Sequence, residues 1–190
     1  MARIGDVVNL PRCEDCGKPL RDSRYSKCYE CSQRARESGG RSAGPSRQFE
    51  SYLSRLAELG YFEKRAPQEK PRMRRELITE EADMVARTLA DAGVAAGPLR
   101  RFFTRARYLE QRLGEEGWDA VANELTRFDP LVTSLVGRAA NSQQRQGLEL
   151  LRKFVCANVA LAEDSEENFR KGFVPHFESV IAYFTYYKPR

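Results

Sequence analysis

From residue 46 onward, apolar residues recur every three or four positions, and no segment shows the clear alternation of a strand. This spacing gathers the apolar side chains on one face of each helix, and such a face must pack against other helices. Prolines and glycines divide the pattern into segments, which predict helices over residues 47–63, 79–92, 98–114, 119–128, 131–140, 148–162 and 165–184. We expect the last one to bend near Gly172 and Pro175. The sequence therefore predicts an all-α helical bundle.

Four of the five cysteines form two pairs near the start, Cys13 with Cys16 and Cys28 with Cys31, in the pattern C-x2-C-x11-C-x2-C. Two intervening residues let both thiolates of a pair bind one tetrahedral ion. Two disulfides are the alternative, but the sequence before Cys13 lacks the apolar stretch of a secretory signal, and intracellular thiols are normally reduced. We expect a structural Zn²⁺, because four thiolates leave no open position for a substrate.

The cysteine pairs lie in a segment that is too short and too polar to bury a core of its own. A metal ion would therefore supply its stability. The run GGRSAGPS, residues 39–46, is typical of a flexible linker. We predict a zinc-binding module with its linker over residues 1–45 and a helical domain over residues 46–190. No apolar run approaches the ~18 residues of a membrane span, so we expect a soluble, cytoplasmic protein.

The net charge of +5 and the isoelectric point near 9.0 favour a polyanionic partner. Between Leu99 and Leu113 the only acid is Glu110, whereas five arginines occur: Arg100, Arg101, Arg105, Arg107 and Arg112. Helical spacing aligns three of them with Tyr108: Arg101, Arg105 and Arg112. A guanidinium donates two parallel hydrogen bonds to a phosphate, and a tyrosine can stack on a base. The alternative is a solvated face that forms salt bridges with neighbouring helices.

A second basic group lies in the proline-broken segment between Lys64 and Arg75 and contains Arg72, Arg74 and Arg75. These residues could close over a bound strand or only keep a loop solvated.

No catalytic site is expected. The chain has one histidine, His176, and lacks the glycine-rich loops that bind phosphates. We expect His176 to be a packed or surface imidazole and Cys156 to be a buried, inert thiol. Tyr183, Tyr186 and Tyr187 are expected in the core or at a subunit interface rather than stacked on bases.

Two segments resemble a known family. One is LRRFFTRARYLEQRL, residues 99–113, which opens with Leu99, Arg100, Arg101, Phe102 and Phe103. The other is FRKGFVPHFESVIAYFTYYK, residues 169–188, with the motif residues Phe177, Glu178, Ile181, Ala182 and Tyr183. Together they resemble the small subunit of the type III-A CRISPR–Cas effector, the Csm complex, and the resemblance spans roughly residues 49–188.

The resemblance implies a helical bundle that is not an enzyme and that serves antiviral defence. Several copies would associate along a guide-RNA filament, beside the backbone subunits and the large subunit. The basic face would contact target RNA, as a single strand or paired with the guide. Arg100 and Arg101 match the family's motif and Arg105 follows on the same stripe, whereas the other five arginines rest on charge alone. The first 45 residues depart from the family, so the role of the zinc module stays open.

Two other classes of function remain as alternatives. The first is a stand-alone zinc-module regulator that binds duplex DNA and dimerises through its helices. The second is a metal-dependent nuclease.

Overall fold

The computed structural model describes Cys13, residues 45–64 and residues 69–188. The residues from Pro45 onward form one unit. Its helices are α2 (Pro45–Leu59), the 3-10 helix η1 (Arg75–Ile78), α3 (Glu80–Asp91), α4 (Ala96–Glu116), α5 (Trp118–Leu125), α6 (Phe128–Gly137), α7 (Ser142–Ala162), the π-helical η2 (Asn168–Phe173) and α8 (Val174–Tyr187). No strand occurs among these residues, which carry only an isolated antiparallel bridge between Phe62 and Met73. The prediction of an all-α bundle is confirmed for this unit.

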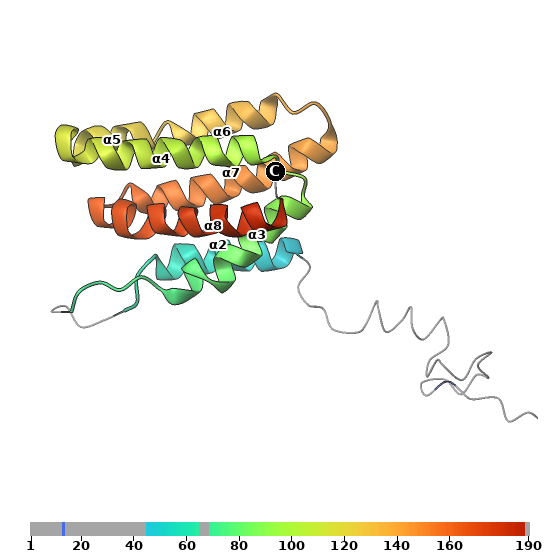
Figure 1. The fold of residues 1–190 in the computed structure, drawn as a ribbon, viewed down its shortest axis with the longest axis horizontal. Coiled ribbons are helices and arrows are strands. Elements are labelled where there is room, and N and C mark those ends of the chain that lie inside the picture. The colour runs from blue at the N-terminus through green and yellow to red at the C-terminus, as the bar shows by residue number, and fades with distance from the viewer. Residues whose placement is uncertain (1–12, 14–44, 65–68, 189–190) are drawn as a thin grey trace, which may run out of the picture. The chain divides into compact units, whose positions relative to one another are not determined.

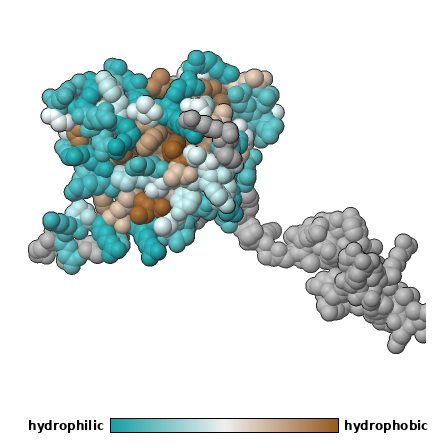
Figure 2. All heavy atoms as spheres, in the orientation of Figure 1, coloured by the Kyte–Doolittle hydropathy of each residue, from teal (hydrophilic) through white to brown (hydrophobic). Residues whose placement is uncertain are grey.

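The bundle has three layers (Figure 1). Helices α7 and α8 lie in the middle, α4, α5 and α6 cover one side, and α2, η1 and α3 cover the other. Hydrophilic residues cover most of the face seen in Figure 2, with a few apolar patches between them. Among the described helices, none is long and apolar enough to cross a membrane.

Aromatic side chains join the outer α4–α6 layer to the middle one. Phe103 of α4 meets Phe177 of α8 edge to face, with 5.7 Å between ring centroids, and Phe128 of α6 meets Phe173 in the same way at 6.4 Å. Phe154 of α7 lies edge-on to Phe177 at 5.2 Å. Such pairs add about 0.5–1.5 kcal/mol each beyond the burial of their area. They fix the position of α4 and α6 on the core.

A hydrogen-bonded polar cluster lies on the other side of the middle layer and connects four elements. The Tyr52 hydroxyl is 2.7 Å from Nε2 of His176, and His176 Nδ1 is 2.6 Å from the carbonyl oxygen of Leu77. Because that carbonyl only accepts, Nδ1 carries the proton and Nε2 accepts from Tyr52. Asn158 donates to the Tyr52 oxygen at 3.1 Å, and Tyr61 donates to the Asn158 backbone oxygen at 2.9 Å. His176 is therefore a packed imidazole, one of the two positions expected for it.

The bend predicted near Gly172 and Pro175 is present as the π-helical turn η2, which leads directly into α8. A Cβ atom at Gly172 would lie 2.4 Å from the ring of Tyr61, so the close approach requires glycine. Pro175 is the second residue of α8, and the wider turn before it accommodates its missing N–H.

Several helix ends differ from the predictions, and the largest difference is at α7, which begins at Ser142 rather than residue 148. The first helix stops at Leu59 rather than residue 63, because Gly60 adopts a φ of +65°. The third continues through Gly114 to Glu116 and ends at Gly117, whose φ is +78°. The break expected at Asp129 and Pro130 lies just before them, between Leu125 and Phe128. Asp129 and Pro130 lie in the first turn of α6, where a proline removes no internal hydrogen bond.

Candidate nucleic-acid interface

Helix α4 presents its arginines on two different flanks. Its buried stripe has helical spacing and consists of Leu99, Phe102, Ala106, Leu109 and Leu113. On one side of this stripe, Phe103 packs against α8, and on the other, Phe102 packs against Phe128 of α6 with 5.8 Å between centroids. Because consecutive residues of an α-helix lie about 100° apart, Arg100 and Arg101 fall on opposite sides of the stripe.

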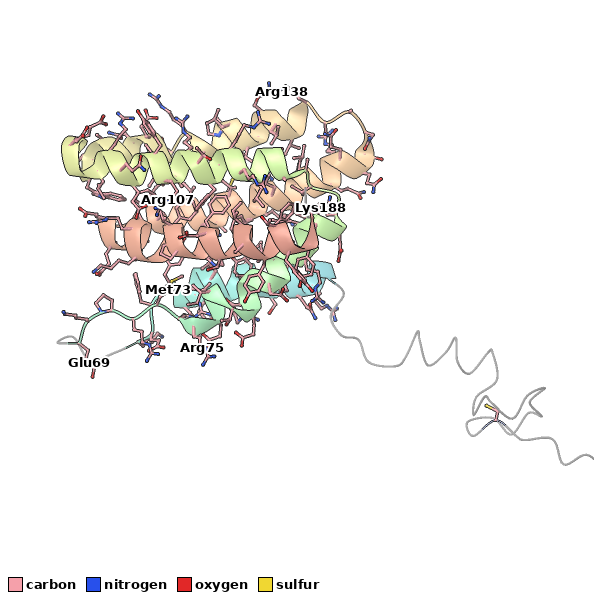
Figure 3. The ribbon with its side chains drawn as sticks, in the orientation of Figure 1. Glu69, Met73, Arg75, Arg107, Arg138 and Lys188 are labelled. Carbon is pink, nitrogen blue, oxygen red and sulfur yellow. The ribbon has the colours of Figure 1, made fainter. Side chains whose placement is uncertain are left out.

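The flank toward α5 and α6 carries Arg101, Arg105 and Arg112, as the predicted stripe requires. Arg100 and Arg107 occupy the flank toward α8. Figure 3 shows Arg107 on that side and Arg138 at the outer edge of the α4–α6 layer. Arg100 and Arg101, the two arginines that match the family motif as RNA contacts, therefore lie on different surfaces of the bundle.

A groove of about 340 Å³ separates α4 from α6, and we call it the α4–α6 groove. Its apolar lining consists of Pro98, Phe102, Leu131 and Leu135, and its basic lining consists of Arg101, Arg105 and Arg138. Leu131 is 43% exposed, so its side chain is accessible within the groove. Among the described residues that line the groove none is acidic, so the lining favours an anion.

Arg101 and Arg138 carry uncompensated charge. Arg101 is exposed and forms no ion pair with any residue that the structure describes. Arg138 is also exposed, and its Nε donates only to the carbonyl oxygen of Ser134 in its own helix, at 3.3 Å. Both guanidinium groups are therefore available to an external phosphate.

Arg105 is half-buried at the base of the groove. Its Nη2 donates to Glu124 of α5 at 2.8 Å, and its guanidinium carbon lies 6.0 Å from the centre of the Phe128 ring. Its Nε is buried without an acceptor, the one such side-chain atom in the described part of the chain. Glu124 also pairs with Arg127 at 2.7 Å. One carboxylate thus serves two guanidinium groups, and the surroundings of Arg105 keep a net positive charge.

The arginines of the second half of α4 are paired with acids of the same helix. Arg107 pairs with Glu110 at 2.7 Å. Arg112 donates from Nε to Glu116 at 2.6 Å and lies over the Tyr108 ring, 5.1 Å from its centre. These contacts favour the solvated, salt-bridged alternative for Arg107 and Arg112. They also cover one face of Tyr108, which weakens it as a stacking surface.

Arg100 is half-buried on the α8 flank and has no ion pair within the described residues. It is accessible in part, but it is separated from the α4–α6 groove by the buried stripe of its own helix.

The three arginines of the proline-broken segment, Arg72, Arg74 and Arg75, have different environments. Arg72 is exposed, with Nε 3.9 Å from Glu63. Arg75 is exposed and without an ion pair in this part of the structure. Arg74 is only 8% exposed, donates to the Gly60 carbonyl oxygen at 2.9 Å and lies 3.4 Å from Glu81. As an RNA contact Arg74 is therefore a poor candidate, because its buried guanidinium attaches this segment to α3.

Of the predicted zinc ligands, only Cys13 lies within the described residues, where it is buried. Cys16, Cys28 and Cys31 lie outside them, so the zinc site and the module around it stay predictions. Among the residues that the structure describes, no group of three or more His, Cys, Asp or Glu side chains could hold a metal ion.

The reactive side chains outside the groove are held in unreactive states. Burial lowers the pKa of His176 to about 4, so its ring stays neutral, and both of its nitrogens are hydrogen-bonded. Cys156 is half-buried rather than buried, and its thiol donates to Asp129 at 3.2 Å. Burial and that carboxylate raise the pKa of Cys156 to about 11, so the nucleophilic thiolate is scarce at neutral pH.

The C-terminal tyrosines divide between packing and exposure. The Tyr187 hydroxyl contacts Asp83 and accepts from Arg87 at 2.9 Å, and Tyr183 is half-buried. Tyr186 is 78% exposed and borders a shallow apolar pocket with Tyr183 and Ala182. Of these tyrosines, Tyr186 is the one exposed enough to contact another subunit, so the expected subunit interface stays a prediction for Tyr186 and this pocket.

Sequence reasoning missed the contribution of α6 to the groove. Leu131, Leu135 and Arg138 are spaced by four and three residues, which puts them on one helical face. The sequence shows this spacing. It does not show that this face lies beside α4, because that depends on how the helices pack.

No curated protein matches this chain, and no solved structure matches it. The sequence model of one family, Csm2 Type III-A, matches residues 72–190, which is more than half of the chain and includes every helix from η1 to α8. The chain therefore belongs to the Csm2 Type III-A family, the small subunits of type III-A CRISPR (Csm) complexes.

Proposed function

We propose that this chain is a non-catalytic, RNA-binding small subunit that contacts target RNA through the α4–α6 groove. The observation that carries the proposal is the pair of uncompensated arginines, Arg101 and Arg138, on two adjacent helices beside an apolar surface. Guanidinium groups suit phosphates because they donate two parallel hydrogen bonds. Membership of the Csm2 family supports the choice of RNA as the polyanion.

In this proposal several copies associate in the cytoplasm along a guide-RNA filament, with the backbone subunits and the large subunit of the complex. Arg100, Arg72 and Arg75 are secondary contacts, since each is at least partly accessible. The four N-terminal cysteines, Cys13 with its three partners in the sequence pattern, bind one structural Zn²⁺. The module they form docks on RNA or on a neighbouring subunit.

The test is the salt dependence of RNA binding by the full-length chain. Each phosphate contact to a single strand contributes about 0.7 to the slope of log K against log salt. Replacing both groove arginines, in Arg101→Gln with Arg138→Gln, should lower that slope by about 1.4. The matched control is Arg107→Gln with Arg112→Gln, which removes the same charge from acid-paired positions and should change the slope less.

An equal or larger loss of slope in the control would overturn the assignment of this surface. Tight, sequence-selective binding to duplex DNA by the isolated chain would instead favour the regulator. Purification from native cells supplies a second criterion. Guide RNA and larger subunits should co-elute with the chain if it belongs to an assembled complex.

A further inference from the structure

We infer that the α4–α6 groove holds one unpaired nucleobase of the bound RNA, in addition to contacting its phosphates. This inference rests on the proposed function and deepens it, because it assigns a ligand to the apolar part of the groove. A surface that bound only phosphates would need the arginines and nothing else.

The apolar lining of the groove provides a surface on which a flat ring can pack. Phe102 and Pro98 come from α4, and Leu131 and Leu135 come from α6. The volume of about 340 Å³ lies at the lower end of the range for small-molecule sites, roughly 300–1,000 Å³. Bases pack on apolar and aromatic side chains regardless of sequence, since every base has a π-face.

The charges around this lining select the occupant. Arg101 and Arg138 come from the two helices that border the groove, and neither has an acidic partner among the described residues. An apolar peptide would leave these charges desolvated and unpaired, which is costly. A nucleotide satisfies both parts of the groove, with its base on the leucines and its flanking phosphates on the arginines.

The base must be unpaired. In a duplex both faces of a base are stacked on neighbours, so a paired base cannot enter a groove in the protein. The unpartnered Nε of Arg105 points to the same kind of ligand, because uracil, cytosine and guanine carry carbonyl acceptors that a small shift of this side chain could reach.

The experiment compares two RNA probes of equal charge with the full-length chain. One is a 12-nucleotide oligouridylate, and the other is the same ribose-phosphate chain without bases. At one fixed salt concentration, anisotropy should give about fivefold to tenfold tighter binding of the oligouridylate. Leu131→Gln should abolish this preference and leave the affinity for the abasic probe unchanged. The control is Leu59→Gln on α2, where a leucine of similar exposure lies in the opposite layer.

Each outcome decides a different question. Equal affinity of the parent chain for the two probes would overturn the base site but leave the phosphate contacts of the proposed function intact. No binding of either probe would overturn the proposed function itself. A Leu131→Gln variant that keeps its base preference but loses self-association, measured by sedimentation, would assign the groove to a second copy of the chain. The comparison of the two probes uses the parent chain, so it tests for a base preference even if a variant folds poorly.

Discussion

The buried His176 makes the stability of the bundle depend on pH between about 4 and 6.5. In the folded chain its pKa is about 4, because burial opposes the charged ring and the nearby Arg74 adds a smaller repulsion. In the unfolded chain an ordinary histidine has a pKa of about 6.5. Between these values the unfolded state binds a proton that the folded state does not. Stability is therefore full above about pH 6.5 and falls as the pH drops toward 4.

The size of the effect follows from the difference between the two pKa values. Each pKa unit corresponds to about 1.4 kcal/mol, so the contribution of His176 falls by about 3 kcal/mol over this range. Against a typical unfolding free energy of about 5–15 kcal/mol, that loss is large. The partners of the ring explain why it cannot simply accept the proton. Nδ1 already donates to Leu77, and a protonated Nε2 would face the Tyr52 hydroxyl as a second donor, so that the hydroxyl proton would lose its acceptor.

Urea unfolding at pH 7.5, 6.0, 5.0 and 4.5 measures this dependence. Trp118 is the only tryptophan in the chain and packs near Phe169, which makes its fluorescence a probe of the bundle. Carboxylates also titrate in this range, so the matched variant is His176→Gln, which removes only the imidazole. The variant should be less stable at neutral pH but should lose about 3 kcal/mol less than the parent on acidification. Parallel curves for parent and variant would refute the reasoning.

Three further perturbations separate structural from functional residues. Gly172→Ala should destabilise the bundle by about 1–3 kcal/mol, because its Cβ would overlap the Tyr61 ring; Gly114→Ala, in open space on α4, should leave thermal unfolding unchanged or raise its midpoint. Arg74→Met should lower the unfolding free energy by about 2–4 kcal/mol, since it leaves a buried carboxylate with one partner fewer, yet RNA affinity should be unchanged; a selective loss of affinity would restore Arg74 as an RNA contact. Metal analysis should return about one zinc per chain, and Cys13→Ser should release it while the urea unfolding of the bundle stays the same, whereas loss of the whole fold would show that the two parts share a core.

The sequence predicts the fold better than the site because helical spacing is local. The stripe of Arg101, Arg105 and Arg112 follows from a fixed rotation per residue, and the structure places these residues on one flank of α4. Which arginine is neutralised depends on distant residues. Glu124 reaches Arg105 only because α5 folds back beside α4. The groove needs α6 as well, so Arg138 could not be paired with Arg101 from the sequence.

Proline predicted one helix boundary in the wrong place. Asp129 and Pro130 predicted a break, but they lie in the first turn of a helix, where the pyrrolidine ring is tolerated. Glycine was more informative wherever its φ is positive, as at Gly60 and Gly117. Both residues end helices, yet the sequence does not distinguish Gly117 from Gly114, because the difference lies in the backbone conformation.

The start of α4 carries no acid and lies beside the basic lining of the α4–α6 groove. Helix N-termini favour acids, and α3 follows this rule with Glu80, Glu81 and Asp83 in its first turn. Helix α4 has no acid in its first turn, as is also true of α2, α7 and α8, and Arg101 follows at the α4–α6 groove. An acid placed in this first turn would therefore favour the helix and add negative charge beside the groove.

Gly97→Glu tests whether an acid at this helix end raises stability and weakens RNA binding. Gly97 is exposed at the second residue of α4 with no atom within 4 Å of a Cβ placed there, so a glutamate fits. It should stabilise the helix by about 1 kcal/mol, through better helix propensity and its interaction with the positive helix end. The same carboxylate lies next to Pro98 at the rim of the α4–α6 groove and should weaken RNA binding about threefold or more, since it repels phosphates. Gly97→Gln, which gains propensity without charge, is the control and should stabilise the helix while keeping RNA affinity. If Gly97→Glu raised stability and left RNA binding intact, the N-terminal half of α4 would not be the surface that meets RNA.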